Sequence, residues 1–339
     1  MKKIVRIVTD NHHYNNLYRQ WDVNADYAAC FDVRFDDVQE CDVLIVLEYP
    51  KSTISCKVAK ENTWVWSMEP PDEEWEWLRK CYKYFSKVVT VDASLAGEKF
   101  IQQQLAIPWQ VEFDYETLAG MDVFEKKSKG LSFITSNYAA RKGHRKRLWF
   151  LQKIKPALQF DLLGRGFTEL QYKSQALLPY KYTIVAENSS YSNYWSEKIA
   201  DAFLCGCLPF YYGCKNLEDY FDKDAFIRID INKPKQAIET IHRAIENNEW
   251  EKRKAAISKA REKILCEYQF FPVMAKLLKE NAVSGHQNKN DLIIPGLEHH
   301  PSQINPYSLH RIYYRLKKFF LKKRYNDPGS NHFGFVTYK

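Results

Sequence analysis

Polar side chains gather where a short apolar run of the chain ends, between residues 187 and 198. Residues 180–186 have the length and apolar character of a buried parallel strand, and a helix is predicted to begin at about Ser196. In open α/β sheets, ligands bind beyond the carboxyl ends of the strands, where helix N-termini present free N–H groups. A carboxylate, an amide, a tyrosine and a lysine at such a point therefore predict a nucleotide site. The side chains concerned are Glu187, Asn188, Tyr194, Glu197 and Lys198.

The elements that must hold these side chains alternate between strands and helices. In the first third, short apolar runs predict strands at 4–8, 43–47, 64–67 and 88–91, with helices at 73–85 and 95–105. A second alternating block begins near Gly130. Its predicted strands are 131–135, 157–163, 180–186 and 209–213, and its further predicted helices are 145–154, 233–248, 250–267 and 271–281. The pattern indicates parallel sheets covered by helices, and the absence of a Gly-x-Gly-x-x-Gly after the first strand disfavours the usual dinucleotide fold.

Three blocks of the second half resemble the donor-binding signature of family 10 glycosyltransferases, the α-1,3/4-fucosyltransferases. They are Glu187-Asn-Ser, Tyr194-x-Ser-Glu-Lys-Ile and Leu208-Pro-Phe-Tyr-Tyr-Gly. The blocks occur in the family's order and spacing, with Tyr182 in place of phenylalanine and Ser196 in place of threonine. The resemblance is strongest over about residues 130–222. It implies the α/β fold called GT-B, in which two Rossmann-like domains face each other across a cleft.

The two alternating blocks indicate the same two-domain fold and join near residues 125–129. The predicted domains are an N-terminal acceptor-binding Rossmann-like domain at 1–126 and a C-terminal nucleotide-sugar-binding domain at 127–284. Residues 285–339 are predicted to form a linker and a basic amphipathic helix and tail.

Two cations are predicted to hold the diphosphate of the donor. Lys198, near a helix N-terminus, is placed to contact phosphate as a point charge. Arg145 follows the strand 131–135, and in the resembled family an arginine in this corner contacts the phosphates. Arg141, Lys142 and Arg147 are alternatives for this second role.

The other donor-site residues have predicted roles of several kinds. Glu197 is placed to accept hydrogen bonds from ribose or sugar hydroxyls, whereas Glu187 and Asn188 either hold the loop or touch the sugar. Tyr194 is predicted to pack on the nucleotide or donate to phosphate. Gly164 closes a strand where the backbone is expected to approach the ligand closely.

Glu69 is the predicted general base, contributed by the other half of the chain. It ends an apolar strand and precedes two prolines, and Pro70 favours an extended conformation that directs Glu69 out of the strand end. The segment resembles the part of family 10 that supplies the catalytic base. Alternatively, Glu69 is only a turn residue, and His12 or His13 in the first loop is the base.

No metal site is predicted. The only Asp-x-Asp, at Asp222 and Asp224, follows a helix rather than an apolar strand, so it is interpreted as a surface turn. Neutralisation of the phosphates is then assigned to Lys198 and Arg145, and a divalent metal is not expected to be essential. The eight cysteines are scattered without a Cys-x-x-Cys pair, which predicts free thiols in a reducing compartment.

The ends of the chain bear on its location. No apolar run of 18 residues is present, and the N-terminus reads as a first strand rather than a signal peptide. The formal net charge of +8 is concentrated partly in residues 310–324, where apolar residues at helical spacing accompany seven Lys or Arg. Such a helix either lies on an anionic membrane surface or packs on the protein body. We predict a cytoplasmic protein, peripheral at the inner face of the membrane if 309–324 contacts lipid.

The resemblance implies an inverting fucosyltransferase that transfers L-fucose from GDP-β-L-fucose in α-1,3 or α-1,4 linkage to a GlcNAc-containing glycan. An oligosaccharide or glycolipid acceptor is expected, such as lipopolysaccharide or another cell-surface polysaccharide. One alternative is a related GT-B enzyme with another nucleotide sugar or acceptor. The other is a non-catalytic protein that binds an anionic polymer or membrane. No nucleic-acid-binding module is recognisable.

Overall fold

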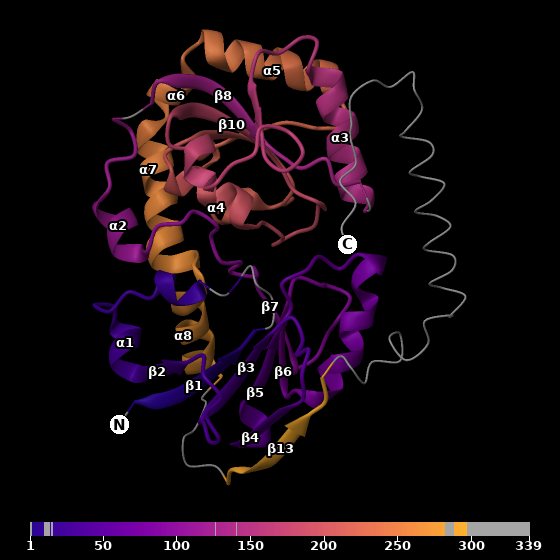
Figure 1. Cartoon of the computed structure of the whole chain (residues 1–339), viewed down its shortest axis with the longest axis vertical. Coiled ribbons are helices and arrows are strands. Elements are labelled where there is room, and N and C mark those ends of the chain that lie inside the picture. Colours follow the sequence, from indigo (N-terminus) through magenta and orange to yellow (C-terminus); the bar gives the residue numbers. More distant parts are fainter. Residues whose placement is uncertain are drawn as a thin grey trace.

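Two lobes, each built on a parallel β-sheet, make up the computed structural model, which describes residues 2–9, 14, 16–125, 127–139, 141–281 and 288–296 (Figure 1). The N-terminal sheet has the strand order β2-β1-β3-β5-β6-β7. Its strands are β1 (Lys3–Val8), β2 (Phe31–Arg34), β3 (Val43–Leu47), β5 (Thr63–Trp66), β6 (Lys87–Thr90) and β7 (Phe100–Gln102). Neighbouring strands pair in parallel throughout. The carboxyl ends of these strands therefore lie at one edge, which faces the other lobe.

The C-terminal sheet has the order β12-β11-β10-β8-β9, again with parallel pairing. Its strands are β8 (Lys129–Ile134), β9 (Asp161–Leu163), β10 (Tyr180–Ala186), β11 (Leu208–Tyr212) and β12 (Ile227–Arg228). The central strand β10 is buried along nearly its whole length, as its apolar composition predicts. Two parallel sheets in facing lobes confirm the predicted α/β, GT-B fold.

The helices agree with the sequence pattern in most places. They are α1 (Asp26–Cys30), α2 (Tyr115–Gly120), α3 (Lys142–Ile154), α4 (Glu197–Leu204), α5 (Pro234–Glu246), α6 (Glu249–Lys252), α7 (Lys254–Lys263) and α8 (Phe270–Glu280). The helix predicted at 73–85 is a 3₁₀ segment, η4 (Glu73–Tyr84). The single helix predicted at 250–267 is divided into α6, α7 and a π-helical segment at Ile264–Tyr268.

Two predictions of local structure are wrong. The helix predicted at 95–105 does not form, because Gly97 takes φ 107° and the chain then pairs with β6 as strand β7. The linker predicted at the start of residues 285–339 contains strand β13 (Asn290–Ile294), which pairs antiparallel with β4 (Ile54–Val58). The predicted basic helix at 309–324 and the tail lie outside the described residues.

The division between the lobes differs from the predicted boundaries. Trp109, Val111 and Leu118 pack in the core of the C-terminal lobe, although they were assigned to the domain 1–126. Helix α8 returns to the N-terminal lobe, where its apolar face packs in the same core as β1, β3 and β5 (Figure 1). The chain therefore crosses between the lobes twice, near residue 107 and again just before α8. Within the described residues, no helix has the length and apolar character needed to cross a bilayer.

Candidate active site

Lys198 lies in the first turn of α4, where several oxygens surround its ammonium group. Its Nζ is 3.3 Å from Glu187 Oε2, 3.3 Å from Glu197 Oε1 and 3.0 Å from Ser196 Oγ. Burial lowers the pKa of Lys198, but the two carboxylates outweigh this effect and raise it above its usual value. The lysine is therefore a fixed positive charge at the N-terminus of a helix, which is a favourable place for an anionic ligand.

Glu187 is a buried carboxylate directly after β10, and it anchors the start of α4. It accepts hydrogen bonds from the backbone N–H of Ser196 at 3.0 Å and from Ser196 Oγ at 2.7 Å. Ser196 in turn is the N-cap residue, with its side chain accepting from the N–H of Lys198. Of the two roles predicted for Glu187, the geometry favours holding the loop, because both oxygens already have partners from α4.

Glu197 belongs to a chain of alternating charges that the sequence pattern revealed only in part. Burial raises the pKa of Glu197, but Lys198 and Lys173 outweigh it and lower the value to about 2. Lys173 lies 3.6 Å from Glu197 and 2.7 Å from Asp201. Asp201 also accepts the backbone N–H of Gln110, in the segment that joins the lobes, at 2.8 Å. Lys173 and Asp201 were not predicted as site residues, although the i, i+4 spacing of Glu197 and Asp201 places both on one face of α4.

The cations near the N-terminus of α3 have different environments. Arg147 is buried, and its Nη1 donates to Asn188 Oδ1 at 2.5 Å and to the carbonyl of Ala186 at 3.3 Å. Arg145 is half-buried and donates to the carbonyl of Ala139 at 3.2 Å. Lys142 is exposed. Arg147 thus fixes Asn188 at the end of β10, whereas Arg145 lies nearer the surface.

His144 has a strongly lowered pKa because of its burial and because cations lie near it at the N-terminus of α3. Burial lowers its pKa, and the charges of Arg147, Arg141, Lys198 and Arg145 lower it further, to about 3. The imidazole therefore stays neutral at ordinary pH while four cations surround it. A site of this kind is suited to a ligand that carries more than one negative charge.

Glu69 lies on the facing lobe, shortly after β5, and responds to the same charges. Burial raises its pKa, Glu48 raises it further, and the positive charges of Arg141 and Lys198 oppose this, leaving a value of about 8. The carboxylate of Glu197 also raises the pKa of Glu69. The charge of Lys198, on the C-terminal lobe, is therefore near enough to Glu69 to act on its pKa.

Tyr194 packs in the core of the N-terminal lobe although it belongs to the loop before α4. Its side chain is only 2% exposed, and burial raises its pKa well above the usual value, with Glu187, Glu69, Glu197 and Asp72 adding to the effect. The ring thus stands between carboxylates of both lobes. Tyr194 is therefore a buried contact between the lobes rather than an exposed stacking surface.

The two lobes make direct contacts beside Glu69. Asp72, three residues after it, accepts a hydrogen bond from Ser189 Oγ and another from the Tyr191 hydroxyl at 2.8 Å. The guanidinium of Arg141 lies 4.0 Å from the centre of the Trp75 ring. These contacts hold the strand ends of the two sheets together.

Gly164 has a structural reason for its residue type. It takes φ 113°, and a Cβ at this position would lie 2.2 Å from the carbonyl oxygen of Thr135. The close approach predicted for this glycine is therefore between two segments of the chain at the ends of β8 and β9.

The predictions for the alternative bases and for a metal site remain. His12 and His13 lie outside the described residues. Asp222 accepts from the backbone N–H of Asp224, and Asp224 pairs with Arg253, as in a surface turn. Across the described ranges, no group of three His, Cys, Asp or Glu side chains is arranged to hold a metal ion.

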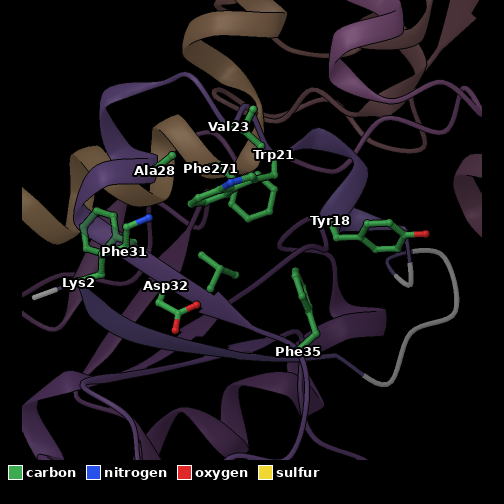
Figure 2. A pocket seen from close by; sticks show the side chains of 10 residues that line it. Lys2, Tyr18, Trp21, Val23, Ala28, Phe31, Asp32, Phe35 and Phe271 are labelled. Atoms are coloured by element: carbon green, nitrogen blue, oxygen red, sulfur yellow. The ribbon is translucent and has the colours of Figure 1, made fainter.

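A cavity of about 420 Å³ lies elsewhere (Figure 2). It follows the edge strand β2 and is lined by Tyr18, Trp21, Phe31, Phe35 and Phe271, among others. None of the predicted site residues lines it. The carboxylates and cations that act on one another across the lobes, Glu69 with Arg141 and Lys198, lie outside this aromatic groove.

Comparisons with known proteins identify relatives of part of the chain. Residues 124–254 match the family described as glycosyltransferase family 10 (fucosyltransferase) C-term. The chain is 27% identical over 149 residues to 4-galactosyl-N-acetylglucosaminide 3-alpha-L-fucosyltransferase 9 of Rattus norvegicus, covering 41% of this chain and 40% of that protein. The protein of the same name from Homo sapiens is 27% identical over 135 residues, covering 37% and 36% of the two chains. The match thus spans well under half the length of these relatives.

Solved structures share the fold at low sequence identity. An α1,3-fucosyltransferase crystal structure superposes with a TM-score of 0.51 and 11% identity, covering 85% of this chain and 91% of that one. An α-glucosyltransferase in complex with UDP and DNA gives a TM-score of 0.50 and 9% identity, covering 84% and 100%. Both similarities concern the two-lobed architecture.

Proposed function

We propose that this protein, whose residues 124–254 belong to glycosyltransferase family 10, transfers L-fucose from GDP-β-L-fucose to a hydroxyl of a GlcNAc-containing glycan. The linkage proposed is α-1,3 or α-1,4, and the acceptor an oligosaccharide or glycolipid of a cell-surface polysaccharide. The observation that supports the proposal is that Lys198, on the C-terminal lobe, is near enough to act on the pKa of Glu69, on the N-terminal lobe.

In the proposed reaction, the C-terminal lobe binds the leaving diphosphate and the N-terminal lobe supplies the base. On the donor side, Lys198 and Arg145 neutralise the diphosphate as it leaves, aided by the N-termini of α3 and α4. On the acceptor side, Glu69 takes the proton of the attacking hydroxyl. A pKa near 8 suits this role, because a base is most effective when its pKa lies close to the working pH.

The reaction proposed is a single displacement with inversion. The acceptor oxygen attacks the anomeric carbon on the face opposite the diphosphate, so a β-linked donor gives an α-linked product. The test is the anomeric configuration of the product, measured by NMR. A β-linked product would contradict the single displacement.

The experiment that tests the donor is transfer from a panel of radiolabelled GDP- and UDP-sugars to GlcNAc-containing acceptors. Transfer from GDP-fucose is expected. Transfer from UDP-glucose alone would instead identify a related GT-B enzyme with another donor. The proposal includes that a divalent metal is not essential, so EDTA should leave the rate unchanged.

The predicted membrane contact through residues 309–324 and the cytoplasmic location remain proposals. Deletion of this segment is expected to release the protein from anionic vesicles while leaving transfer to a soluble acceptor. A non-catalytic binding protein would instead lose its function when this segment is deleted and keep it in Lys198→Ala.

A further inference from the structure

Glu48 and Glu69 leave neighbouring strands at the same edge of the N-terminal sheet. Strands β3 and β5 are parallel, with Leu47 opposite Trp66, and the N–H of Glu48 donates to the carbonyl of Trp66 at 2.8 Å. Glu69 lies three residues beyond Trp66, the last residue of the neighbouring strand β5. Two carboxyl groups are thus brought to one edge of the sheet, where the facing lobe contributes Lys198 and Arg141.

Glu48 is held in an unusual conformation for its residue type. It takes φ 66°, in the left-handed region that is unfavourable for a residue with a Cβ. The residue is only 7% exposed, although burial of a carboxylate is unfavourable. The hydroxyl of Tyr14, itself buried, donates to Glu48 Oε1 at 3.1 Å. Backbone strain and a buried carboxylate at one residue point to a functional role.

Charged groups from both lobes act on the pKa of Glu69 besides its own burial. Among the described residues they include Glu48 directly after β3, Arg141 from the loop before α3, and Glu197 and Lys198 from α4. Glu48 is the largest of these influences, and its negative charge raises the pKa of Glu69. The two cations act in the opposite direction, so Glu48 offsets the positive field that binds an anionic donor.

We propose that Glu48 is a positioning residue for the transfer reaction, whose buried negative charge, held by Tyr14, keeps Glu69 basic beside the cations of the donor site. This inference rests on the proposed function. In the step concerned, the acceptor oxygen forms a bond to the anomeric carbon and its proton passes to the Glu69 carboxylate. The bond from that carbon to the diphosphate breaks, and its electron pair leaves with the nucleoside diphosphate. Without Glu48, the same cations would hold Glu69 as a more weakly basic carboxylate.

The test is the pH profile of kcat/KM for the full-length protein and its Glu48→Gln variant. The wild-type rate is expected to rise with pH through the pKa of Glu69, near 8. In Glu48→Gln this acid limb should move to lower pH by roughly one unit, because a like charge has been removed. The ratio of variant to wild-type rate should then increase about tenfold between pH 9 and pH 6. A merely structural role would lower the rate by the same factor at every pH, and this result would overturn the inference.

Three further variants make the result specific to the charge of Glu48. Glu48→Asp keeps the carboxylate and should restore the wild-type limb, while Tyr14→Phe should shift the limb in the same direction as Glu48→Gln but less. Glu98→Gln, an exposed glutamate of the same lobe, should have the wild-type profile. If Glu48→Gln does not fold, Tyr14→Phe decides alone, and an unmoved limb there contradicts the inference.

A measurement without turnover separates this inference from the proposed function. Titration of ¹³C-labelled glutamate by NMR, with Glu69 assigned through Glu69→Gln, should show a high pKa that falls in Glu48→Gln. A pKa of Glu69 that does not change overturns the inference even in an active fucosyltransferase. Absence of transfer from every donor, with the pKa shift present, would overturn the proposed reaction and leave the charge coupling demonstrated.

Discussion

The Nζ of Lys198 lies 3.3 Å from the Oε2 of Glu187, whose other oxygen accepts the N–H of Ser196 at 3.0 Å. One buried carboxylate therefore fixes both the N-cap of α4 and the cation beside it. Glu187, at the end of β10, therefore fixes both the start of α4 and the position of the Lys198 ammonium group. Both oxygens of Glu187 have partners within the protein, so Lys198 is the member of this pair that is placed to meet an anionic ligand.

Removal of Lys198 should affect turnover more than folding. In Lys198→Ala, the leaving diphosphate loses a preorganised positive charge, and kcat/KM is expected to fall about 100- to 1,000-fold. Initial rates with GDP-fucose measure the effect, and Lys153→Ala, an exposed lysine of α3, is the matched control. A loss shared equally by both variants would argue against a specific role for Lys198.

Glu187→Ala should destabilise the C-terminal lobe. The change leaves Lys198 and the N–H of Ser196 without their buried partner, and breaking a buried ion pair from one side costs about 3–5 kcal/mol. Urea denaturation gives the free energy of unfolding. The control is Glu218→Gln, which removes a more exposed ion pair with Arg228 and should cost less than about 1 kcal/mol. Equal losses in the two variants would show that the burial of Glu187 has no energetic consequence.

Glu197 should make the stability of the protein depend on acid pH. Its pKa is about 2 in the folded protein against 4.5 ordinarily, so the unfolded chain binds more protons between these values. The stability that Glu197 contributes is fully present above about pH 4.5 and is lost as the pH falls towards 2. The difference in the free energy of unfolding between wild type and Glu197→Gln, measured from pH 7 to pH 3, should therefore shrink at the acid end. A difference that is constant with pH would contradict the low pKa.

Much of this site was predictable from the chain because it follows one strand and one helix. The run 180–186, the polar residues after it and the cap at Ser196 have local causes, so Glu187, Glu197 and Lys198 were found together. The strand ends of parallel sheets share one edge, and Glu69 was chosen as a carboxylate that follows the end of such a strand. Glu48 was missed although the same rule applied, since a carboxylate directly follows the buried strand β3.

Other features depend on contacts that no local pattern contains. Asp72 meets Ser189 across 117 residues of sequence, and only the closure of the lobes brings them together. The return of α8 to the N-terminal lobe is of the same kind, because an apolar helix face does not specify which lobe it covers. A helix was wrongly predicted at 95–105 because the helical spacing of its apolar residues was given more weight than Gly97. The positive φ of Gly97 turns the chain into β7 instead.

Asp72 should control how often the lobes are closed. In Asp72→Ala, Ser189 and Tyr191 lose their partner on the other lobe, and the loss of about 1 kcal/mol per hydrogen bond should lower kcat/KM roughly 5- to 30-fold. Small-angle scattering should show a larger radius of gyration without GDP, and Asp36→Ala, at an exposed carboxylate of the same lobe, should change neither quantity. If Ser189→Ala and Asp72→Ala are fully additive in a double-mutant cycle, the hydrogen bond does not couple the lobes.

Gly143→Ala should separate the first turn of α3 from the end of β10. A Cβ at Gly143 would lie 2.0 Å from the carbonyl oxygen of Asn188 and 2.9 Å from its Cα, so the helix and the loop must move apart. Overpacking of this size costs about 1–3 kcal/mol, and the bond from Arg147 to Asn188 should weaken with it. Urea denaturation and calorimetric titration with GDP are the measurements, with lower stability and weaker binding expected together. Gly130→Ala is the matched control, because a Cβ there has no neighbour within 4 Å, so it should retain both properties. Wild-type binding of GDP by Gly143→Ala would show that the donor site does not depend on the contact between α3 and Asn188.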